Sequence, residues 1–568
     1  MVDNTFKIIV LENAYKHKGK ADIKFALGAV ISRFPEWRDK RKELSDILAP
    51  LISEINSLSI DEQEKEIEKL APELLEKKEK EDRNIYAFMH INPGDKVKSA
   101  FPPGPEKYFH IGHAKSVLLN YLLAKQYNGK FQLRFEDTNP RLVKNEFYEI
   151  SQEDFKWLGI EWDELVFASD YIDMLKEQAE KLILKGQAYV CFCNPDKMSE
   201  LREKKEACDC RFASPEQNLI YWKEMESYPE GKASLRLKID LKHKNTRMRD
   251  PTIFRIIDCE HPRIGYKHRN YPAYDFQNAV LDGYFNITHR LRTVEFEMAS
   301  ELHHYIRNKL GLYDTYTYEF ARFNLEGMLA SGRDIRDKVN SGELIGWDDP
   351  SLPTLRALKR RGFTPEAIKQ MVIESGITKS SGSLITWDTL IKYNKRVLND
   401  SAKRFFFIAD PVEINVLDDP KREYHLRVHP NLDLGTRDFK SNGNYYIERF
   451  DKDSFRDGNF VRLMDNINFI YAQDVNHFRS QEYIDFKNEE EPDKKIIHFL
   501  PVDDSQLVKA TIFKPDHSLL TGIAEKHIEA LKVGDIIQFE RFGFCRLDSI
   551  EEDKENKGKK IYNFWFTH

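Results

Sequence analysis

Three things are scarce in this 568-residue chain, and each scarcity excludes a class of protein. No stretch approaches the roughly 18 to 20 consecutive apolar residues that a membrane-spanning helix requires, so we expect no membrane partner. Only six residues are cysteines, too few for a disulfide framework, which indicates a reducing, cytoplasmic setting. Positive charge is not in surplus: the net charge of −6 excludes a histone-like polycation and argues weakly against a nucleic-acid partner.

What the chain does have is the composition of an ordinary folded protein, 41% hydrophobic and 12% aromatic. Its length predicts roughly four domain-sized units. Residues 4–83 carry apolar residues at helical spacing and end in a charged run typical of a solvated helix face. From residue 96 the pattern becomes strand (96–101), helix (112–127) and strand (130–135), which predicts a parallel sheet.

The rest of the chain divides by pattern as well. A second strand–helix signal covers residues 287–310, and the stretch before it, about 188–282, is too long for a crossover and predicts an inserted subdomain. Residues 354–407 are helical in pattern. From residue 408 short alternating segments, separated by turn residues, predict a β-barrel or sandwich.

The sharpest local motif is His110-Ile111-Gly112-His113, between a Pro-Pro-Gly-Pro loop and the start of a helix. Free backbone N–H groups at a helix start favour a phosphate, and glycine lets a nucleotide approach the backbone. Two imidazoles there can donate hydrogen bonds to charge that develops on a transferring phosphoryl group. Two helix-capping histidines are the simpler alternative. The strand–helix–strand context favours adenylyl transfer, by a class I aminoacyl-tRNA synthetase or a small-molecule nucleotidylyltransferase.

Eight segments, in this order along the chain, resemble the glutamyl/glutaminyl family of class I aminoacyl-tRNA synthetases, in the archaeal-type branch that ends in β-barrels. They are FPPGPEKYFHIGHAKS, LRFEDTNP, DFKWLGIEWDELVFASDY, KLILKGQAYVCFC, MRDPTIFRI, YPAYDFQNAV, GWDDPSLPTLRALKRRGF and QFERFGFCRLDS. The helical N-terminal part is similar to that branch too, so the resemblance covers nearly the whole chain. A nucleotidylyltransferase needs neither the GWDDP-to-LKRRGF segment nor a barrel region.

The resemblance implies an α/β fold: a Rossmann-type class I catalytic domain with an inserted acceptor-binding subdomain, a helical N-terminal domain, a helical connector and a C-terminal β-barrel anticodon-binding region. We expect the N-terminal domain at 1–90, the two catalytic halves at 91–187 and 286–340, the insertion at 188–285, the connector at 341–407 and the barrels at 408–568. The second catalytic half is expected to carry a KMSKS-like loop.

The resemblance also assigns an ATP site and a tRNA path. It places ATP at Pro103, His110, Gly112 and His113, with Ser331 and Arg333 of the KMSKS-like loop, and makes His110, His113 and Arg333 catalytic. Basic tracts at 242–244, 247–249, 359–361 and 403–404 are each typical of a solvated helix face, but their distribution along a synthetase-like chain indicates a tRNA path. The expected tRNA contacts are Arg134, Lys359, Arg360, Arg361 and Arg541, the last with Phe542 beside it.

The amino-acid site is expected at Asp137, Tyr274 and Arg292. Arg292 lies in LRTVEF, where glutaminyl enzymes are similar to this sequence but carry a small uncharged residue. A guanidinium there can pair bidentately with a substrate carboxylate, whereas glutamine would leave it unpaired. Glutamate is therefore the expected amino acid, and a surface ion-pair arginine is the alternative reading of this residue.

Two departures from the family pattern concern catalysis. The arginine that usually opens the loop before the HIGH motif is replaced by Ala100, and Gly104 stands where a glutamate is usual. In the KMSKS-like loop Gly332 stands where a lysine is usual, which would cost about 10²–10³ in rate without compensation. Arg333 is the expected substitute cation and Arg336 the reserve.

Four of the six cysteines form two close pairs, Cys191 with Cys193 and Cys208 with Cys210. Four thiolates in two pairs are a reasonable tetrahedral zinc set, although this spacing is tighter than the commoner Cys-x-x-Cys. Some glutamyl enzymes carry zinc at this point of the insertion, so we expect a structural Zn²⁺, with reduced thiols in a compact turn as the alternative. Cys259 and Cys545 are expected in the core.

The expected protein is a monomeric glutamate–tRNA ligase. With ATP and Mg²⁺ it would convert glutamate to glutamyl-adenylate and transfer the glutamyl group to the 3′-terminal adenosine of tRNA(Glu), with tRNA(Gln) open as a second substrate. A glutaminyl-tRNA synthetase is an alternative that Arg292 disfavours. A catalytically weak tRNA-binding paralogue is another, motivated by Ala100 and Gly332.

Overall fold

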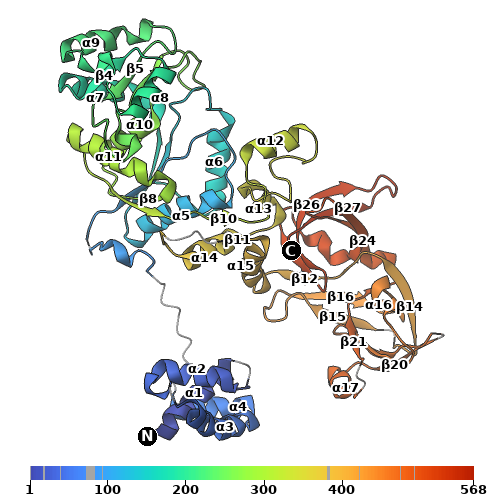
Figure 1. Ribbon diagram of the computed structural model, residues 1–568. Coiled ribbons are helices and arrows are strands. Elements are labelled where there is room, and N and C mark those ends of the chain that lie inside the picture. Colours follow the sequence, from blue (N-terminus) through green and yellow to red (C-terminus); the bar gives the residue numbers. More distant parts are fainter. Residues whose placement is uncertain are drawn as a thin grey trace. The chain divides into compact units, whose positions relative to one another are not determined.

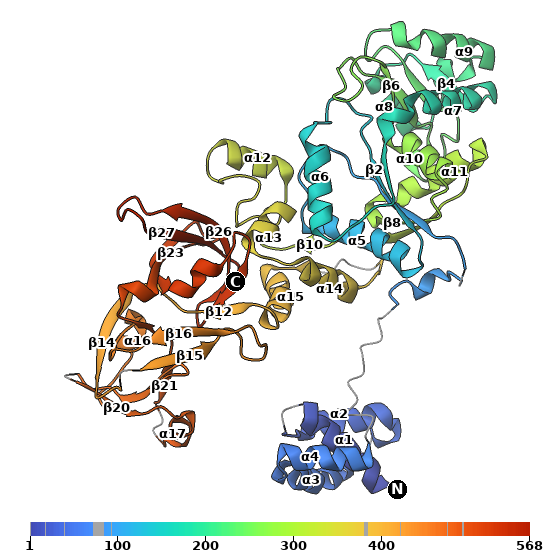
Figure 2. The same ribbon diagram turned by 180° about the vertical axis from the view of Figure 1, so that it is seen from behind.

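The computed structural model describes residues 2–16, 19–38, 40–71, 84–92, 94–379, 384–420, 422–473, 475–490 and 493–568 (Figures 1 and 2). The chain forms two compact units, Met1–Asn84 and Ile85–His568, which are described separately below. None of the described helices combines the length and the apolar character that crossing a bilayer would require.

The N-terminal unit is a bundle of helices, and an apolar stripe from each helix meets in one core. Asp22 caps the second helix by accepting hydrogen bonds from Lys24 N and Phe25 N, and Ser59 with Glu62 forms a capping box on the fourth. The charged run expected as a solvated helix face lies mostly at 72–83, outside the described residues. The helices are α1 (Val2–Lys16), α2 (Ile23–Arg33), α3 (Arg41–Ser57) and α4 (Ile60–Leu70).

The catalytic part of the second unit is a parallel five-stranded sheet in the order β3-β2-β1-β8-β9, as the strand–helix–strand pattern predicts. Side chains alternate between its faces. Leu133 and Leu291 pack with α5 in the main core, whereas Arg134 and Arg290 reach Asp282 on α10. The strands are β1 (Lys98–Phe101), β2 (Lys130–Phe135), β3 (Glu164–Phe167), β8 (His289–Thr293) and β9 (Tyr316–Phe320). The helices are α5 (Ile111–Gln126), α6 (Glu146–Trp157), α10 (Tyr274–Tyr284) and α11 (Glu297–Leu310).

The insertion is a four-stranded antiparallel sheet in sequential order β4-β5-β6-β7, with its own core. The sheet ends with Pro272 of β7, and Asp282 of the following α10 accepts a hydrogen bond from Arg134 of the catalytic sheet; the expected boundary at 285 remains a prediction. The strands are β4 (Ala188–Cys191), β5 (Ser234–Leu237), β6 (Thr252–Ile256) and β7 (Asn270–Pro272), with α7 (Ile172–Leu184), α8 (Pro195–Lys204) and α9 (Pro215–Glu224) beside them.

The connector is attached to the start of α5. Ile111 N donates to Pro353 O at 3.0 Å and Leu355 N donates to Phe109 O at 2.9 Å, so the residues before α13 run beside the HIGH motif. The elements are β10 (Asn324–Leu325), α12 (Gly332–Asn340), α13 (Leu355–Arg361), α14 (Pro365–Ser375), β11 (Leu384–Ile385) and α15 (Trp387–Asn399).

The C-terminal part contains two seven-stranded sheets, β12-β25-β26-β27-β23-β24-β13 and β21-β18-β19-β20-β14-β17-β22. The edge strands of each sheet are consecutive in the chain, so each sheet curls into a near-barrel around its own core. This arrangement confirms the expected barrel region. The strands are β12 (Lys403–Phe405), β13 (Phe407–Ile408), β14 (Pro411–Leu417), β17 (Asn444–Glu448), β18 (Phe460–Leu463), β19 (Asn468–Ile470), β20 (Asn476–Ser480), β21 (Lys495–Ile497), β22 (Leu500–Pro501), β23 (Leu507–Phe513), β24 (Leu519–Glu525), β25 (Ile536–Phe539), β26 (Gly543–Glu552) and β27 (Lys560–Phe566). A hairpin of β15 (Glu423–Arg427) and β16 (Thr436–Lys440) and two short helices, α16 (Arg449–Asp453) and α17 (Tyr483–Asn488), accompany them.

Candidate active site

The two histidines of the HIGH motif cap the helix that they begin. His110 Nδ1 accepts a hydrogen bond from Gly112 N at 3.0 Å, and His113 Nδ1 accepts one from His110 N at 3.2 Å. Both rings therefore carry their proton on Nε2, which leaves each ring one N–H donor. Burial lowers the pKa of His110 to about 4 and that of His113 well below its usual range, so both imidazoles are neutral at pH 7.

This geometry corrects one sequence expectation. The backbone N–H groups at the start of α5 do not await a phosphate: Ile111 N donates to Pro353 O, Gly112 N to the His110 ring and His113 N to His110 O. The two imidazole Nε2–H groups are the donors that remain. Gly112 has a steric reason of its own, because a Cβ there would lie 2.7 Å from Cε1 of His110.

The RFEDT segment lies against the loop that precedes the HIGH motif, since Glu136 N donates to the carbonyl of Pro103 at 2.9 Å. Asp137 is fully buried, and its carboxylate accepts hydrogen bonds of 2.7 Å from Ser169 N, Ser169 Oγ and Tyr148 Oη. In this structure Asp137 therefore orders the loop. The Asp137 carboxylate is not exposed, so this geometry does not support the expected direct contact with glutamate, which remains a prediction.

Arg134 is buried too, in a cluster that spans the sheet. Its Nε donates to Glu136 at 3.0 Å and its Nη2 donates to Asp282 at 2.9 Å, while Nη1 has no hydrogen-bond partner among the described residues. Arg290, on β8, donates to the same Asp282 and, at 2.6 Å, to Asn278. The two arginines hold the pKa of the Asp282 carboxyl well below its usual range, although burial alone would raise it. This placement gives no support to the expected tRNA contact of Arg134, which remains a prediction.

The structure brings Arg292 and Tyr274 together. Arg292 Nη2 donates to Tyr274 Oη at 2.7 Å, its Nη1 lies 2.9 Å from His303 Nδ1, and its guanidinium carbon is 4.4 Å from the Phe296 ring centroid. The residue is only 6% exposed, yet its guanidinium pairs with no carboxylate of the described residues. A buried, unneutralised guanidinium beside an exposed tyrosine is suited to an incoming carboxylate.

The KMSKS-like loop leads into α12. Ser331 caps that helix by accepting a hydrogen bond from Asp334 N at 3.4 Å, and no atom lies within 4 Å of a Cβ built on Gly332. Arg333 and Arg336 are exposed, and neither forms an ion pair within the part of the chain that the structure describes. Through Ile335, α12 packs on the residues that precede α13, which themselves run beside His110.

The basic tract on α13 separates into three roles. Lys359 is exposed, whereas Arg360 binds Asp548 and Asp348 and stacks 4.0 Å over Trp565. Arg361 is buried and donates to the carbonyls of Pro350, Phe566 and Thr567, which joins the connector to the end of the chain. Arg360 and Arg361 thus hold the connector to the end of the chain, and this geometry gives no support to their expected tRNA contacts, which remain predictions.

Arg541 is also engaged, in a tight turn with φ 62°. Its two terminal nitrogens donate to the carboxylate of Asp451 at 2.6 and 2.7 Å, and Nη1 lies 3.2 Å from His498 Nδ1. A bidentate pair leaves the guanidinium few donors for RNA, so the expected role of Arg541 in anticodon reading remains a prediction without support from this geometry.

The four paired cysteines converge. Their Sγ atoms all lie within 4.8 Å of one another, and Cys191 Sγ is 3.9 Å from Cys208 Sγ. Four thiolates around one Zn²⁺ with Zn–S bonds of about 2.3 Å would lie about 3.8 Å apart, so the set fits a structural zinc. Cys545 is buried in the core as expected, but Cys259 lies in a loop after β6 and is only partly buried.

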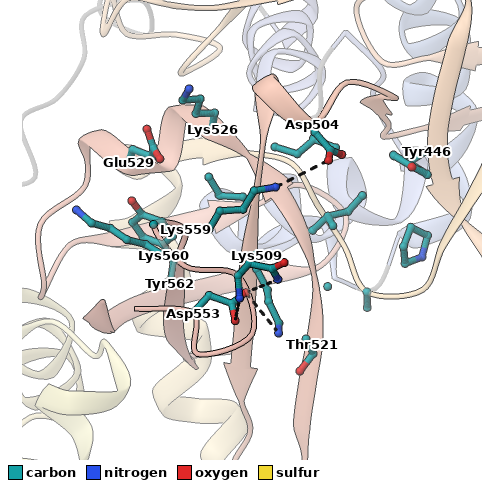
Figure 3. A pocket seen from close by; sticks show the side chains of 18 residues that line it. Tyr446, Asp504, Lys509, Thr521, Lys526, Glu529, Asp553, Lys559, Lys560 and Tyr562 are labelled. Atoms are coloured by element: carbon teal, nitrogen blue, oxygen red, sulfur yellow. Dashed lines mark hydrogen bonds and ion pairs between the residues drawn. The ribbon is translucent and has the colours of Figure 1, made fainter. Parts of the chain in front are cut away.

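A cavity of about 850 Å³ lies among the barrel strands (Figure 3). Strands β14, β17, β23, β24 and β27 contribute to its lining. Its ionised groups are partly paired, as in the 3.9 Å contact of Lys509 with Asp553 and the 3.8 Å contact of Lys559 with Asp504. Lysines and two tyrosines around one hollow are groups that a nucleotide could use. The lining includes Tyr446, Asp504, Lys509, Lys526, Glu529, Asp553, Lys559, Lys560 and Tyr562.

Sequence reasoning missed several residues of this site. His303 was hidden in a pair of histidines, where helical spacing places His303 inward with Leu302 and Ile306 and leaves His304 exposed. Arg290 and Asp282 carried no signal, since a single buried ion pair between a strand and a helix has no sequence period.

Comparison with known proteins gives one consistent picture. Residues 96–400 match the model of "tRNA synthetases class I (E and Q), catalytic domain", and residues 402–487 and 467–548 match two models of the "anti-codon binding domain" of the same class. The glutamate–tRNA ligase of Methanothermobacter marburgensis is 37% identical, covering 97% of this chain and 98% of its own. That of Pyrococcus abyssi is 38% identical over 96% and 97%, and that of Methanococcus maripaludis is 35% identical over the full length of both. A solved glutamate–tRNA synthetase from Elizabethkingia anophelis aligns with a TM-score of 0.39 at 20% identity, covering 54% of this chain and 72% of its own.

Proposed function

The chain belongs to the class I tRNA synthetases of the glutamate and glutamine (E and Q) family, and from that premise we propose that it is a glutamate–tRNA ligase. The α-carboxylate of glutamate attacks the α-phosphorus of ATP, and pyrophosphate leaves. The terminal ribose hydroxyl of tRNA(Glu) then attacks the carbonyl of the glutamyl-adenylate, and AMP leaves. Neither step needs a covalent enzyme intermediate, because positioning and electrostatics suffice.

The choice of glutamate as the amino acid rests on the buried guanidinium of Arg292, which has no carboxylate partner among the described residues. Its partners Tyr274 and His303 are neutral, so its charge is not cancelled before the substrate arrives. Burial lowers the pKa of His303 to about 4 and keeps that ring uncharged. The side-chain carboxylate of glutamate can pair bidentately with Arg292, whereas glutamine would bring an N–H₂ group against a guanidinium that can only donate.

The HIGH histidines are proposed to bind the ATP phosphates through their Nε2–H groups. Neutral imidazoles at both positions can donate to a phosphoryl oxygen without losing a proton at pH 7. Arg333 is proposed as the cation that stands in for the missing lysine, since it is exposed and unpaired within the described chain and lies on α12, which packs beside the HIGH segment. ATP would arrive with Mg²⁺ on its phosphates, which supplies further neutralising charge.

Arg290 is proposed to supply the charge that family resemblance places at position 100. Ser99 pairs with His289 between β1 and β8, so Ala100 and Arg290 are neighbours on one face of the sheet, the face that also carries Arg292. The small side chain of Ala100 leaves room there for a guanidinium rooted on the next strand.

For tRNA, we propose that the insertion binds the acceptor end, that Lys359 contacts the inner elbow, and that the barrel cavity takes part of the anticodon loop. Charging of tRNA(Gln) as a second substrate is left to the assay below. We propose further that the enzyme acts as a monomer. The low cysteine content supports the proposal that it works in the reducing cytoplasm.

We also propose that Cys191, Cys193, Cys208 and Cys210 hold a structural Zn²⁺. Four protein ligands leave no open coordination position, so its contribution is to the fold of the insertion.

One experiment tests the function: aminoacylation of tRNA(Glu) and tRNA(Gln) with labelled glutamate or labelled glutamine, each with ATP and Mg²⁺. Glutamate on tRNA(Glu) is the expected product. Glutamine as the preferred amino acid would identify a glutaminyl enzyme instead. No product from either amino acid, together with tight tRNA binding, would favour a catalytically weak tRNA-binding paralogue, the alternative suggested by Gly332.

A further inference from the structure

A separate cavity, of about 470 Å³, lies in the insertion, where three arginines from three elements line it. Arg202 comes from α8, Arg236 from β5 and Arg255 from β6. The neighbouring elements are fixed by the cysteine cluster, because Cys193 lines the cavity and Met198 of α8 contacts Cys191 Sγ at 3.6 Å. This arginine pocket (Arg202, Arg236 and Arg255) therefore lies next to the cysteine cluster.

The charge of the arginine pocket is not balanced within the protein. None of its three guanidinium groups forms an ion pair with a carboxylate in the described ranges. The one acidic residue in the lining, Glu230, is taken elsewhere: its carboxylate accepts from Arg141 at 2.6 Å and from Asp258 N at 2.9 Å. Three like charges around one cavity repel one another, so a bound anion would lower the electrostatic energy of the folded chain.

The guanidinium donors are also incompletely used. Arg236 is only 6% exposed, and although it donates to Thr252 Oγ1 at 2.8 Å, its buried Nε has no acceptor among the described residues. Arg202 donates to Thr246 O at 2.9 Å, and its buried Nε likewise has none. A buried donor without an acceptor is unfavourable, so these two arginines are held at a cost within the folded chain.

We propose that the arginine pocket binds a phosphate group, and that in the working enzyme this is a backbone phosphate of the bound tRNA. The planar guanidinium fork fits the oxygens of a phosphate. The RNA assignment rests on the proposed function; the phosphate assignment rests on the pocket alone. A polyanion is favoured over a small free anion because the segment bonded to Arg202 also exposes Lys242 and Lys244, which extend the positive surface beyond the cavity.

The test is equilibrium binding of full-length tRNA(Glu) to the intact protein over a range of salt concentrations, without ATP or glutamate. The variants are Arg202→Gln, Arg236→Gln and Arg255→Gln. The matched control is Lys204→Gln, which removes the same charge from the same helix, at a side chain that is exposed and outside the pocket. Arg255→Gln keeps the test open if the buried Arg236→Gln fails to fold, because Arg255 is exposed.

The expected result is a binding constant weakened roughly fivefold to tenfold per arginine, with a log K against log salt slope shallower by about 0.7 to 0.9 per lost contact. Lys204→Gln should bind as the wild type does. Arginine variants with unchanged tRNA affinity and slope, and with unchanged thermal stabilisation by added inorganic phosphate, would overturn the proposal. Unchanged tRNA binding together with loss of thermal stabilisation by inorganic phosphate would overturn the RNA assignment. Because the assay needs no catalysis, a wild type that binds tRNA but fails to charge it would count against the proposed function and not against the pocket.

Discussion

The guanidinium of Arg292 donates a 2.7 Å hydrogen bond to the hydroxyl of Tyr274, and its other terminal nitrogen lies 2.9 Å from Nδ1 of His303. A guanidinium can only donate, so His303 accepts there and carries its proton on Nε2, which faces Asp275 at 3.0 Å. Neutral groups thus fix the orientation of Arg292 without cancelling its charge.

Arg292→Cys should therefore cut kcat/KM for glutamate at least a hundredfold, because a pair of charged hydrogen bonds worth about 3 kcal/mol is lost. The measurement is tRNA-dependent ATP–pyrophosphate exchange with glutamate. Arg33→Gln, which removes an exposed arginine paired with Glu12 in the N-terminal unit, is the matched control and should leave exchange unchanged. Unchanged glutamate kinetics in Arg292→Cys would remove the argument for glutamate.

A second prediction concerns the α12 cations. Arg333→Gln should lower kcat about 10²–10³-fold, the usual effect of removing one preorganised donor from a developing charge. Because a Cβ at Gly332 meets no atom within 4 Å, Gly332→Lys should fit and should restore most of the rate in the Arg333→Gln background. Arg336→Gln is the comparison: a severe loss there with a harmless Arg333→Gln would reassign the role to Arg336.

The fold around these residues was largely predictable from the sequence. The helix of the HIGH motif and its parallel strands were predicted from the strand–helix–strand pattern, and the structure places Tyr274 and Arg292, both expected in the amino-acid site, within hydrogen-bond distance. Arg292 is buried in the structure, and its role in choosing glutamate remains a prediction.

The burial of polar residues could not be predicted in the same way. Asp137 and Arg361 sit in motifs that suggested substrate contact, yet their partners Ser169 and Thr567 lie 32 and 206 residues away along the chain. A hydrogen bond of that sequence separation leaves no local pattern. The same holds for the backbone donors at the start of α5. The N–H of Ile111 donates to the carbonyl of Pro353, and no pattern within residues 100–130 predicts this hydrogen bond.

The pH dependence of stability supplies a third prediction. Burial lowers the folded-state pKa of His303 to about 4, below the unfolded value of about 6.5, so the unfolded chain binds the extra proton first. The contribution of His303 to stability is present above pH 6.5 and is lost as the pH falls toward 4, about 2 kcal/mol of it by pH 5.

His303→Gln isolates this effect, since glutamine can still accept from Arg292 and donate to Asp275 but does not titrate. Urea unfolding at pH 7 and pH 5 should show a smaller loss of unfolding free energy in the variant than in the wild type. Equal losses in the two proteins would mean that His303 is not held neutral.

Metal removal gives a fourth prediction. The purified protein should carry about one zinc per chain, and Cys191→Ser and Cys208→Ser should each abolish it, because a tetrahedral thiolate site needs all four ligands. Cys259→Ser, which lies outside the cluster, should retain the metal. Since Cys193 and Met198 line the arginine pocket, zinc loss should also weaken tRNA binding. If elemental analysis finds no zinc in wild-type protein purified without chelators, the four cysteines do not hold a structural Zn²⁺.

The last prediction concerns Arg290 and the alanine beside it. Arg290→Gln should lower kcat/KM for glutamate about tenfold or more, because it removes one positive charge from the sheet face that carries Arg292 and leaves Asp282 with Arg134 alone. Loss of activity alone could reflect a disturbed sheet, so the decisive variant is the double exchange Ala100→Arg with Arg290→Ser, which moves the guanidinium to the adjacent strand on the same face. Recovery of glutamate exchange in the double variant above the level of Arg290→Ser would support a shared role, because a merely structural arginine has no reason to work from either strand. If the double variant folds with an unchanged thermal transition and remains as impaired as Arg290→Ser, Arg290 does not replace an arginine at position 100.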